Sequence, residues 1–162
     1  MATTAAPPHL PALGSHQRDV VAHELQATLL ELVDLSLLGK QLHWSVVGSH
    51  FRSLHLQLDE LVDSWRELAD TVAERTVAIG AWPDGQADAI AAGSDHATLE
   101  RGAITDHTVV RELTRILQGI SERVRERTDR LGEFDIVSQD VLIDVVRELE
   151  QQLWMIRAQL PS

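Results

Sequence analysis

The chain has 162 residues and no cysteine, and its 25 acidic and 14 basic residues give a net charge of −11. This length suffices for one domain with a substantial core, and the lack of cysteine excludes disulfides and thiolate metal sites. The negative charge argues against a general attraction to nucleic acid, which needs lysine and arginine, and Lys40 is the single lysine. No apolar run reaches the length of a membrane span and the N-terminus shows no signal-peptide pattern, so we expect a cytoplasmic protein.

The first half of the chain predicts a tail and two long helices. Residues 1–15, rich in Ala, Thr and Pro, are expected to form a flexible N-terminal tail, and residues 16–162 to form one folded domain. Apolar residues recur at helical spacing over about residues 17–44 and again over about 50–79. Residues 46–49 between them include a glycine and predict a turn.

The second half predicts a long connection and two further helices. Gly80 ends the second helix, residues 83–85 (Pro-Asp-Gly) form a turn, and residues 87–92 suit a short connecting helix. Helical spacing returns over about residues 107–131 and 138–160. The sequence therefore predicts an all-α fold, a ferritin-like four-helix bundle with a long crossover that carries a short helix between the second and third helices.

Five residues with nitrogen and oxygen donors stand at fixed intervals: His43, His55, Asp59, Asp70 and Glu74. Imidazoles and carboxylates without a thiolate are a donor set that suits iron. With His55 as zero and about 100° per residue, Asp59, Asp70 and Glu74 fall near about 40°, 60° and 100° on the second helix. The four residues on this helix therefore share one stripe, away from its leucine-rich face, and this stripe needs a partner of its own.

One straight helix cannot bring all of these ligands to one metal ion, because Asp59 and Asp70 are separated by about 16 Å along its axis. An antiparallel copy of the helix, crossing a two-fold axis near Trp65, places His55 and Asp59 of one chain opposite Asp70 and Glu74 of the other. The turn at residues 46–49 lies midway between the two histidines and brings them together. The spacing thus predicts an intersubunit site, present twice in a dimer at a separation of about 22 Å.

The residues around the two histidines resemble a known family. His43 lies in Lys-Gln-Leu-His-Trp-Ser-Val-Val-Gly (residues 40–48) and His55 in His-Phe-Arg-Ser-Leu-His (residues 50–55). With the spacing of the five ligands, these stretches resemble the Dps family, the miniature ferritins named DNA-binding proteins from starved cells, over about residues 25–160. The resemblance implies an iron-storage protein that oxidises Fe²⁺ at intersubunit ferroxidase sites, usually with hydrogen peroxide. It also implies a hollow shell of twelve subunits, built from two-fold dimers, in which ferric oxide is stored and cell and DNA are protected from Fenton chemistry.

The ligand types suggest a role for each residue. We expect Asp70 and Glu74 to be the charge-neutralising anchors for iron, and Asp59 to bridge or to hold a second metal ion through water. Histidine donors leave coordination positions open for peroxide or dioxygen, and the sequence leaves the choice of oxidant open. The opposing interpretation makes the histidines hydrogen-bonded interface residues and the acids a solvated face. All five in register, within matching flanks, favour the metal site.

Further roles follow only from the resemblance. Family members carry a tryptophan at the position of Trp44 that donates electrons during peroxide turnover; packing against the dimer face is the alternative. Asp140 and Asp144 fall in a region that lines iron-admitting pores in the family, and Asp140 matches an acidic pore position. Acidic residues near the start of any helix also stabilise it through its dipole. Trp154 matches a family position near the C-terminus and is expected in the core.

DNA binding is not carried over from the family name. Members that bind DNA commonly do so through a lysine-rich terminal tail, whereas residues 1–15 contain neither Lys nor Arg. The arginines of residues 123–130 alternate with acidic residues, a pattern typical of a solvated helix surface with local ion pairs. Metal binding by His9, His16 and His23 near the N-terminus is left open.

Two alternatives of other classes remain at this point. The first is a structural nucleoid protein with little ferroxidase activity, which the missing basic tail disfavours. The second is an ordinary helical bundle that serves as an interaction module, which predicts a monomer or dimer in solution. The ferroxidase and iron-storage cage is the hypothesis that uses all five ligands.

Overall fold

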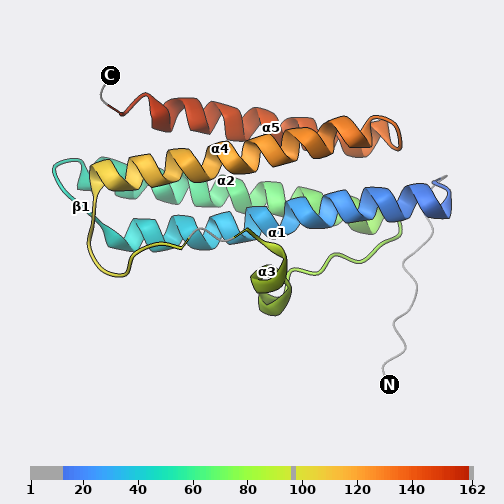
Figure 1. Ribbon diagram of the computed structural model, residues 1–162, viewed down its shortest axis with the longest axis horizontal. Helices are drawn as coiled ribbons and strands as arrows, with labels where there is room; N and C mark the ends of the chain where they lie inside the picture. Colours follow the sequence, from blue (N-terminus) through green and yellow to red (C-terminus); the bar gives the residue numbers. More distant parts are fainter. Residues whose placement is uncertain (1–12, 96–97, 161–162) are drawn as a thin grey trace.

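The computed structural model describes residues 13–95 and 98–160, which form a bundle of four long helices (Figure 1). In chain order the long helices are α1 (Ser15–Ser45), α2 (Phe51–Ala78), α4 (Asp106–Leu131) and α5 (Ile136–Arg157). The short helix α3 (Ala87–Gly93) lies on the crossover between α2 and α4. The main packing pairs are α1 with α2 and α4 with α5. The predicted all-α bundle, with its long crossover and short helix, is confirmed.

The helix ends agree with the expected ranges to within a few residues. Helix α1 begins at Ser15, which therefore belongs to the helix and not to the predicted tail, while residues 1–12 of that tail lie outside the described residues. Helix α5 begins at Ile136, earlier than expected, because the Asp135 carboxylate accepts a hydrogen bond from the Ser138 backbone N–H and caps its first turn.

The core runs along the bundle axis, and leucine is its commonest residue. Trp65 is fully buried at the middle of α2, and its ring lies so close to Gly39 on α1 that a Cβ at Gly39 would come within 2.5 Å of it. The Trp65 indole N–H donates to the Gln152 side-chain oxygen on α5 at 2.6 Å, which satisfies the one polar atom of the ring. Trp65 therefore joins three of the four long helices at the centre of the molecule.

Two short strands close one end of the bundle, and the sequence pattern did not predict them. Strand β1 (Val46–Val47) pairs in parallel with β2 (Ile104–Thr105), with Val46 opposite Ile104. Both of those residues are buried. The ladder ties the α1–α2 turn to the end of the crossover, immediately before α4 begins.

A buried ion-pair network joins α1 to α4. Arg127 donates to Glu31 at 2.7 Å, and Arg130 donates to both carboxylate oxygens of Glu24 at 3.0 Å. The side chains of Glu31 and Arg127 are only 5% and 11% exposed. The interpretation of residues 123–130 as a solvated surface is therefore wrong for part of the cluster, although Arg125 is exposed and pairs with Glu150 on α5.

The expectation that Trp154 lies in the core is wrong. Its residue exposure is 68%, while Gln152 and Ile156 on the same helix are buried. Trp154 follows Gln152 by two positions, which is about 200° around the helix, so the two side chains must face opposite sides.

No helix in the described part of the chain combines the length and the apolar character that a membrane span requires.

Candidate metal centre

The two histidines of the predicted site meet at the α1–α2 turn. His43 lies in the last turn of α1 and His55 in the first turns of α2. Their rings stack with centroids 3.5 Å apart and planes 23° from parallel, and Phe51 lies against His55 at 5.1 Å. His43 is buried and His55 is half-buried. The spacing argument that the turn brings the two imidazoles together is confirmed, whereas their binding of metal stays a prediction.

Each imidazole is oriented by the backbone of the other residue. Nδ1 of His43 lies 2.8 Å from the His55 carbonyl oxygen, and Nδ1 of His55 lies 3.0 Å from the His43 carbonyl oxygen. A carbonyl only accepts hydrogen bonds, so each Nδ1 must carry the proton. In the neutral form each ring then has its lone pair on Nε2, and this is the form that binds a divalent metal ion. The reciprocal bonds also satisfy one of the carbonyl groups left unpaired at the end of α1.

Asp59 lies one turn beyond His55 and is already engaged by a cation. The Lys40 ammonium donates to its carboxylate at 2.6 Å, and the same oxygen lies 3.3 Å from Nδ1 of His43. The Lys40 hydrogen bond is the main cause that lowers the pKa of Asp59, and it outweighs desolvation, which would raise it. Asp59 is therefore an ionised oxygen donor beside the imidazoles, with the single lysine of the chain as its counter-ion.

Asp70 and Glu74 lie further along α2, away from the histidine pair. Both are exposed, and neither makes a hydrogen bond or ion pair among the residues that the structure describes. Asp70 stands at the rim of an apolar groove of about 350 Å³ between α1 and α2, lined also by Leu29, Val33 and Leu37. Leu37 is 57% exposed. In the described parts of one chain, no three His, Asp or Glu side chains come close enough to hold one metal ion.

The remaining predicted residues are at the surface. Trp44, beside His43, is 71% exposed. Asp140 and Asp144 are exposed on the outer face of α5, where Asp144 accepts a hydrogen bond from Arg147 at 2.7 Å. Of the N-terminal histidines, His9 lies outside the described residues. The ring of His16 packs edge-on against that of Phe134, with the ring centroids 6.3 Å apart.

The turn behind the histidine pair is held by a residue that the sequence interpretation missed. Asp106, the first residue of α4, accepts from the His50 backbone N–H at 2.8 Å and lies 3.2 Å from the His50 ring and 3.5 Å from the Ser49 hydroxyl. Its other oxygen accepts from the His107 backbone N–H at 2.8 Å. No role was assigned to Asp106 from the sequence, because nothing local links it to a turn more than fifty positions earlier.

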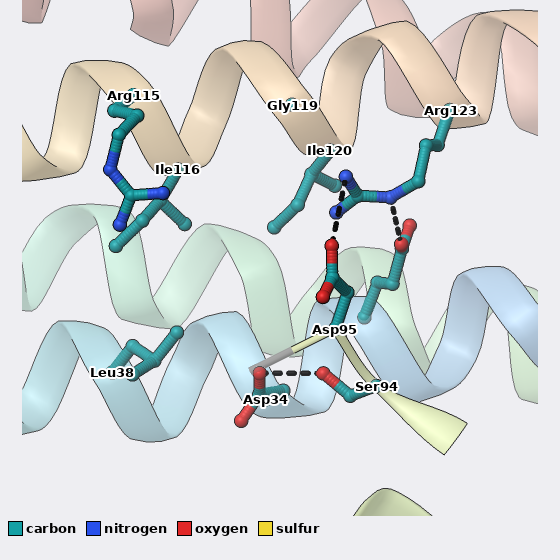
Figure 2. A pocket seen from close by; sticks show the side chains of 10 residues that line it. Asp34, Leu38, Ser94, Asp95, Arg115, Ile116, Gly119, Ile120 and Arg123 are labelled. Carbon is teal, nitrogen blue, oxygen red and sulfur yellow. Dashed lines mark hydrogen bonds and ion pairs between the residues drawn. The ribbon is translucent and has the colours of Figure 1, made fainter. Parts of the chain in front are cut away.

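A second group of charged side chains surrounds a small cavity between α1, α4 and the crossover (Figure 2). Figure 2 shows Arg123 pointing towards Asp95, and Ser94 beside Asp34, to which it donates at 2.6 Å. Arg123 also donates to Glu31. The cavity measures about 60 Å³ and none of the predicted metal ligands lines it. It therefore belongs to the contact of the crossover with the bundle and not to the candidate metal centre.

Comparisons with known proteins agree with this fold along nearly the whole chain. The ferritin-like domain family matches residues 22–161. A DNA protection during starvation protein of Mycolicibacterium smegmatis is 36% identical over 155 residues, which cover 94% of this chain and 84% of that protein. The solved structure of Mycobacterium smegmatis Dps in a tetragonal crystal form has a TM-score of 0.91 at 34% identity, covering 99% of this chain and 96% of that one. DpsA14 from Streptomyces coelicolor has a TM-score of 0.90 at 32% identity, covering 98% and 96%.

Proposed function

This chain belongs to the Dps family of ferritin-like proteins, and we propose that it is a ferroxidase whose active site forms between two copies of the chain. The family as a whole stores iron and protects DNA. The finer assignment for this chain, to Fe²⁺ oxidation at His43, His55 and Asp59 of one subunit with Asp70 and Glu74 of another, is our proposal. The stacked and mutually oriented histidine pair is the observation that supports it most.

The histidine pair has the properties of one half of a metal site. In their neutral form the two imidazoles have free Nε2 lone pairs, so that with the carboxylate of Asp59 beside them they offer two nitrogen donors and one oxygen donor. The backbone hydrogen bonds fix both rings before metal arrives, so little ordering entropy is lost on binding.

The other half must come from a second chain. Asp70 lies eleven positions after Asp59 on the same continuous helix α2, which is about 16 Å along the axis. The exposed apolar groove beside Asp70 is a surface that a partner can bury, and an antiparallel α2 would bring Asp70 and Glu74 to the histidine pair. The two carboxylates would then neutralise Fe²⁺ while the histidines complete its coordination.

The proposed reaction uses hydrogen peroxide as the oxidant. Two Fe²⁺ ions each give one electron, the O–O bond of one peroxide breaks, and two protons are taken up to yield two waters and two Fe³⁺ ions. Lys40 would have to release Asp59 for this carboxylate to ligate metal, so its ammonium holds the site closed until a cation of higher charge arrives. Trp44 is adjacent to His43 and exposed, which suits an electron donor as well as a contact at the dimer face.

We further propose that the dimers assemble into a hollow shell of twelve chains that stores the ferric product in the cytoplasm. Asp140 and Asp144 would line a pore through which Fe²⁺ enters. Asp140 is exposed, in keeping with this role, whereas the pairing of Asp144 with Arg147 makes it the weaker candidate. An Asp140→Asn variant that takes up iron at the wild-type rate would remove the pore assignment without touching the ferroxidase site.

A complementation experiment tests the shared site directly. The variants His43→Ala/His55→Ala and Asp70→Ala/Glu74→Ala should each lose fast peroxide-dependent Fe²⁺ oxidation, followed by stopped-flow absorbance. Co-assembled in equal amounts, they should recover about a quarter of the wild-type rate, because half of the dimers are mixed and each holds one intact site of two. The control His16→Ala/His23→Ala should oxidise Fe²⁺ as wild type does.

Size exclusion of the same samples separates site from assembly. We expect a particle of roughly 200 kDa, about twelve chains on the family pattern, for every variant, and ferric iron co-eluting with it only where oxidation occurs. Full activity of the histidine variant would refute the site. A large particle that never retains iron would instead favour the alternative of a structural DNA-associated protein, which a gel shift at physiological salt would then examine.

A further inference from the structure

We propose that Asp106 is a positioning residue for the His43–His55 pair, acting through the α1–α2 turn. The inference deepens the proposed function, since it takes that pair to be half of the iron site. Asp106 touches neither histidine of the pair. It holds the turn whose two ends carry them.

The Asp106 carboxylate binds the turn and its own helix at the same time. One oxygen accepts the His50 backbone N–H at 2.8 Å, with the His50 ring and the Ser49 hydroxyl at 3.2 and 3.5 Å. The other oxygen accepts the His107 backbone N–H at 2.8 Å. Its side chain is only 17% exposed. Hydrogen bonds from the two backbone amides are the main cause that lowers the pKa of Asp106, so the anchor is ionised throughout the neutral range.

The turn is shaped to receive this carboxylate. Gly48 has φ of +131°, and a Cβ on it would lie 2.5 Å from the Asp106 carboxyl group. Glycine is therefore required at this position both for the backbone conformation and for the close approach of Asp106. On the preceding residues, the pairing of Val46 with Ile104 holds the same turn to the end of the crossover.

The histidine pair depends on where this turn sits. His43 lies three residues before β1, and His55 lies in the second turn of α2, so the pair spans the turn from both sides. Each ring bonds to the carbonyl of the other residue, at 2.8 and 3.0 Å. A displacement of the end of α1 relative to the start of α2 would lengthen both bonds at once. Releasing the turn from Asp106 should therefore loosen both imidazoles together, although both remain in the chain.

The test compares Asp106→Ala with Asp135→Ala in the full-length assembled protein. Asp135 is a matched control, because it also lies at the start of a helix, as the cap of α5, and accepts bonds from a backbone amide and a distant side chain, but at the other end of the bundle. Deuterium exchange at the C2 position of each histidine, read by mass spectrometry, reports the surroundings of His43 and His55 without any iron. Co²⁺ affinity, measured by titration calorimetry, reports the pair as ligands.

We expect Asp106→Ala to raise the exchange rate of both His43 and His55 and to weaken Co²⁺ binding by about ten-fold, in the range seen when outer partners of metal-binding histidines are removed. Asp135→Ala should change neither, even if it lowers thermal stability as much. If Asp106→Ala does not assemble, Asp106→Asn keeps the shape with a single acceptor oxygen and should show the same changes, smaller in size.

Unchanged exchange at both histidines in the Asp106 variants would overturn the proposal, and so would an equal change in Asp135→Ala, since that would indicate a general loss of stability. The proposed function fails separately. If wild-type protein does not oxidise Fe²⁺ but Asp106→Ala still loosens both imidazoles, the positioning role stands and the ferroxidase assignment does not.

Discussion

Glu31 offers a sharp test of how the bundle is held together. Its carboxylate is 5% exposed and accepts charge-assisted bonds from Arg123 at 2.5 Å and Arg127 at 2.7 Å. The substitution Glu31→Gln keeps the volume and removes the negative charge. Arg127, itself 11% exposed, is then left with Glu24 at 4.0 Å as its nearest counter-ion, and Glu24 already binds Arg130.

The expected cost follows from leaving a buried guanidinium poorly compensated. Breaking one partner of a buried pair typically costs about 3–5 kcal/mol, and we expect about 3 kcal/mol because Arg123 is half-buried and can regain water. With a urea dependence of about 2 kcal/mol per molar, the unfolding midpoint should fall by about 1.5 M. Because assembly contributes to stability, every variant is unfolded at the same protomer concentration.

Two further variants isolate the cause. Glu150→Gln breaks the exposed pair with Arg125 and should shift the midpoint by no more than about 0.3 M, as expected for a surface ion pair. The double substitution Glu31→Met/Arg127→Met removes both buried charges and should recover most of the loss. Equal shifts of the urea midpoint for Glu31→Gln and Glu150→Gln would refute the reasoning, because burial would then have no effect on how much an ion pair contributes to stability.

Three more outcomes follow from particular contacts. Lys40→Gln should raise the pKa of Asp59 towards its ordinary value and, at neutral pH, tighten Co²⁺ binding in calorimetry; an unchanged affinity would mean that the ammonium does not compete with metal. Gly48→Ala should destabilise the protein by about 2 kcal/mol in urea unfolding, through its positive φ and its approach to the Asp106 carboxyl group. Gly102→Ala, with φ of +105° and nothing within 4 Å, is the control that carries the backbone strain alone and should cost less. Burial would raise the pKa of Asp135, but hydrogen bonds from Ser138 and Arg75 outweigh it and lower the pKa. The stabilising effect of Asp135 is therefore present above the ordinary carboxyl pKa and lost as the pH falls through the lowered value, so thermal stability should decline less on acidification in Asp135→Asn than in wild type.

The apolar periodicity of each long helix was enough to predict the bundle, and the turn between the first two helices was enough to predict that the two histidines meet. The long helices repeat their apolar residues over many turns, and a turn midway between His43 and His55 leaves little freedom in how they meet. The expectation that Trp154 lies in the core came from the family resemblance and not from its angle on the helix. Trp154 follows Leu149 by five positions, about 140° around the helix, which puts it away from the leucine-bearing side that is buried.

Contacts between distant segments could not be predicted from the sequence, for a different reason. Arg127 alternates with acidic neighbours on its own helix, but its partner is Glu31, almost a hundred positions earlier. Asp106 and His50 are likewise 56 positions apart. In both cases the local pattern satisfies a surface interpretation, and only the packing of α1 against α4, or of the turn against the start of α4, decides which charges are removed from water.

In the proposed site, some ligands are held in place within one chain and the others are exposed, and this division predicts that metal binding and dimer formation are coupled. The nitrogen donors are fixed within one chain, by backbone carbonyls at the end of α1 and the start of α2, and Asp59 is held ionised by Lys40. Asp70 and Glu74 stay exposed, and Asp70 lies beside a mainly apolar groove that Ser36 and Arg66 also line, so that desolvation of two carboxylates opposes docking. A divalent cation between the two halves removes that penalty, because it neutralises the charges that the interface must bury. Metal binding should therefore strengthen the dimer, and a two-fold dimer that tightens on addition of Co²⁺ in wild type but not in Asp70→Ala/Glu74→Ala is the physical consequence of dividing the ligands between chains.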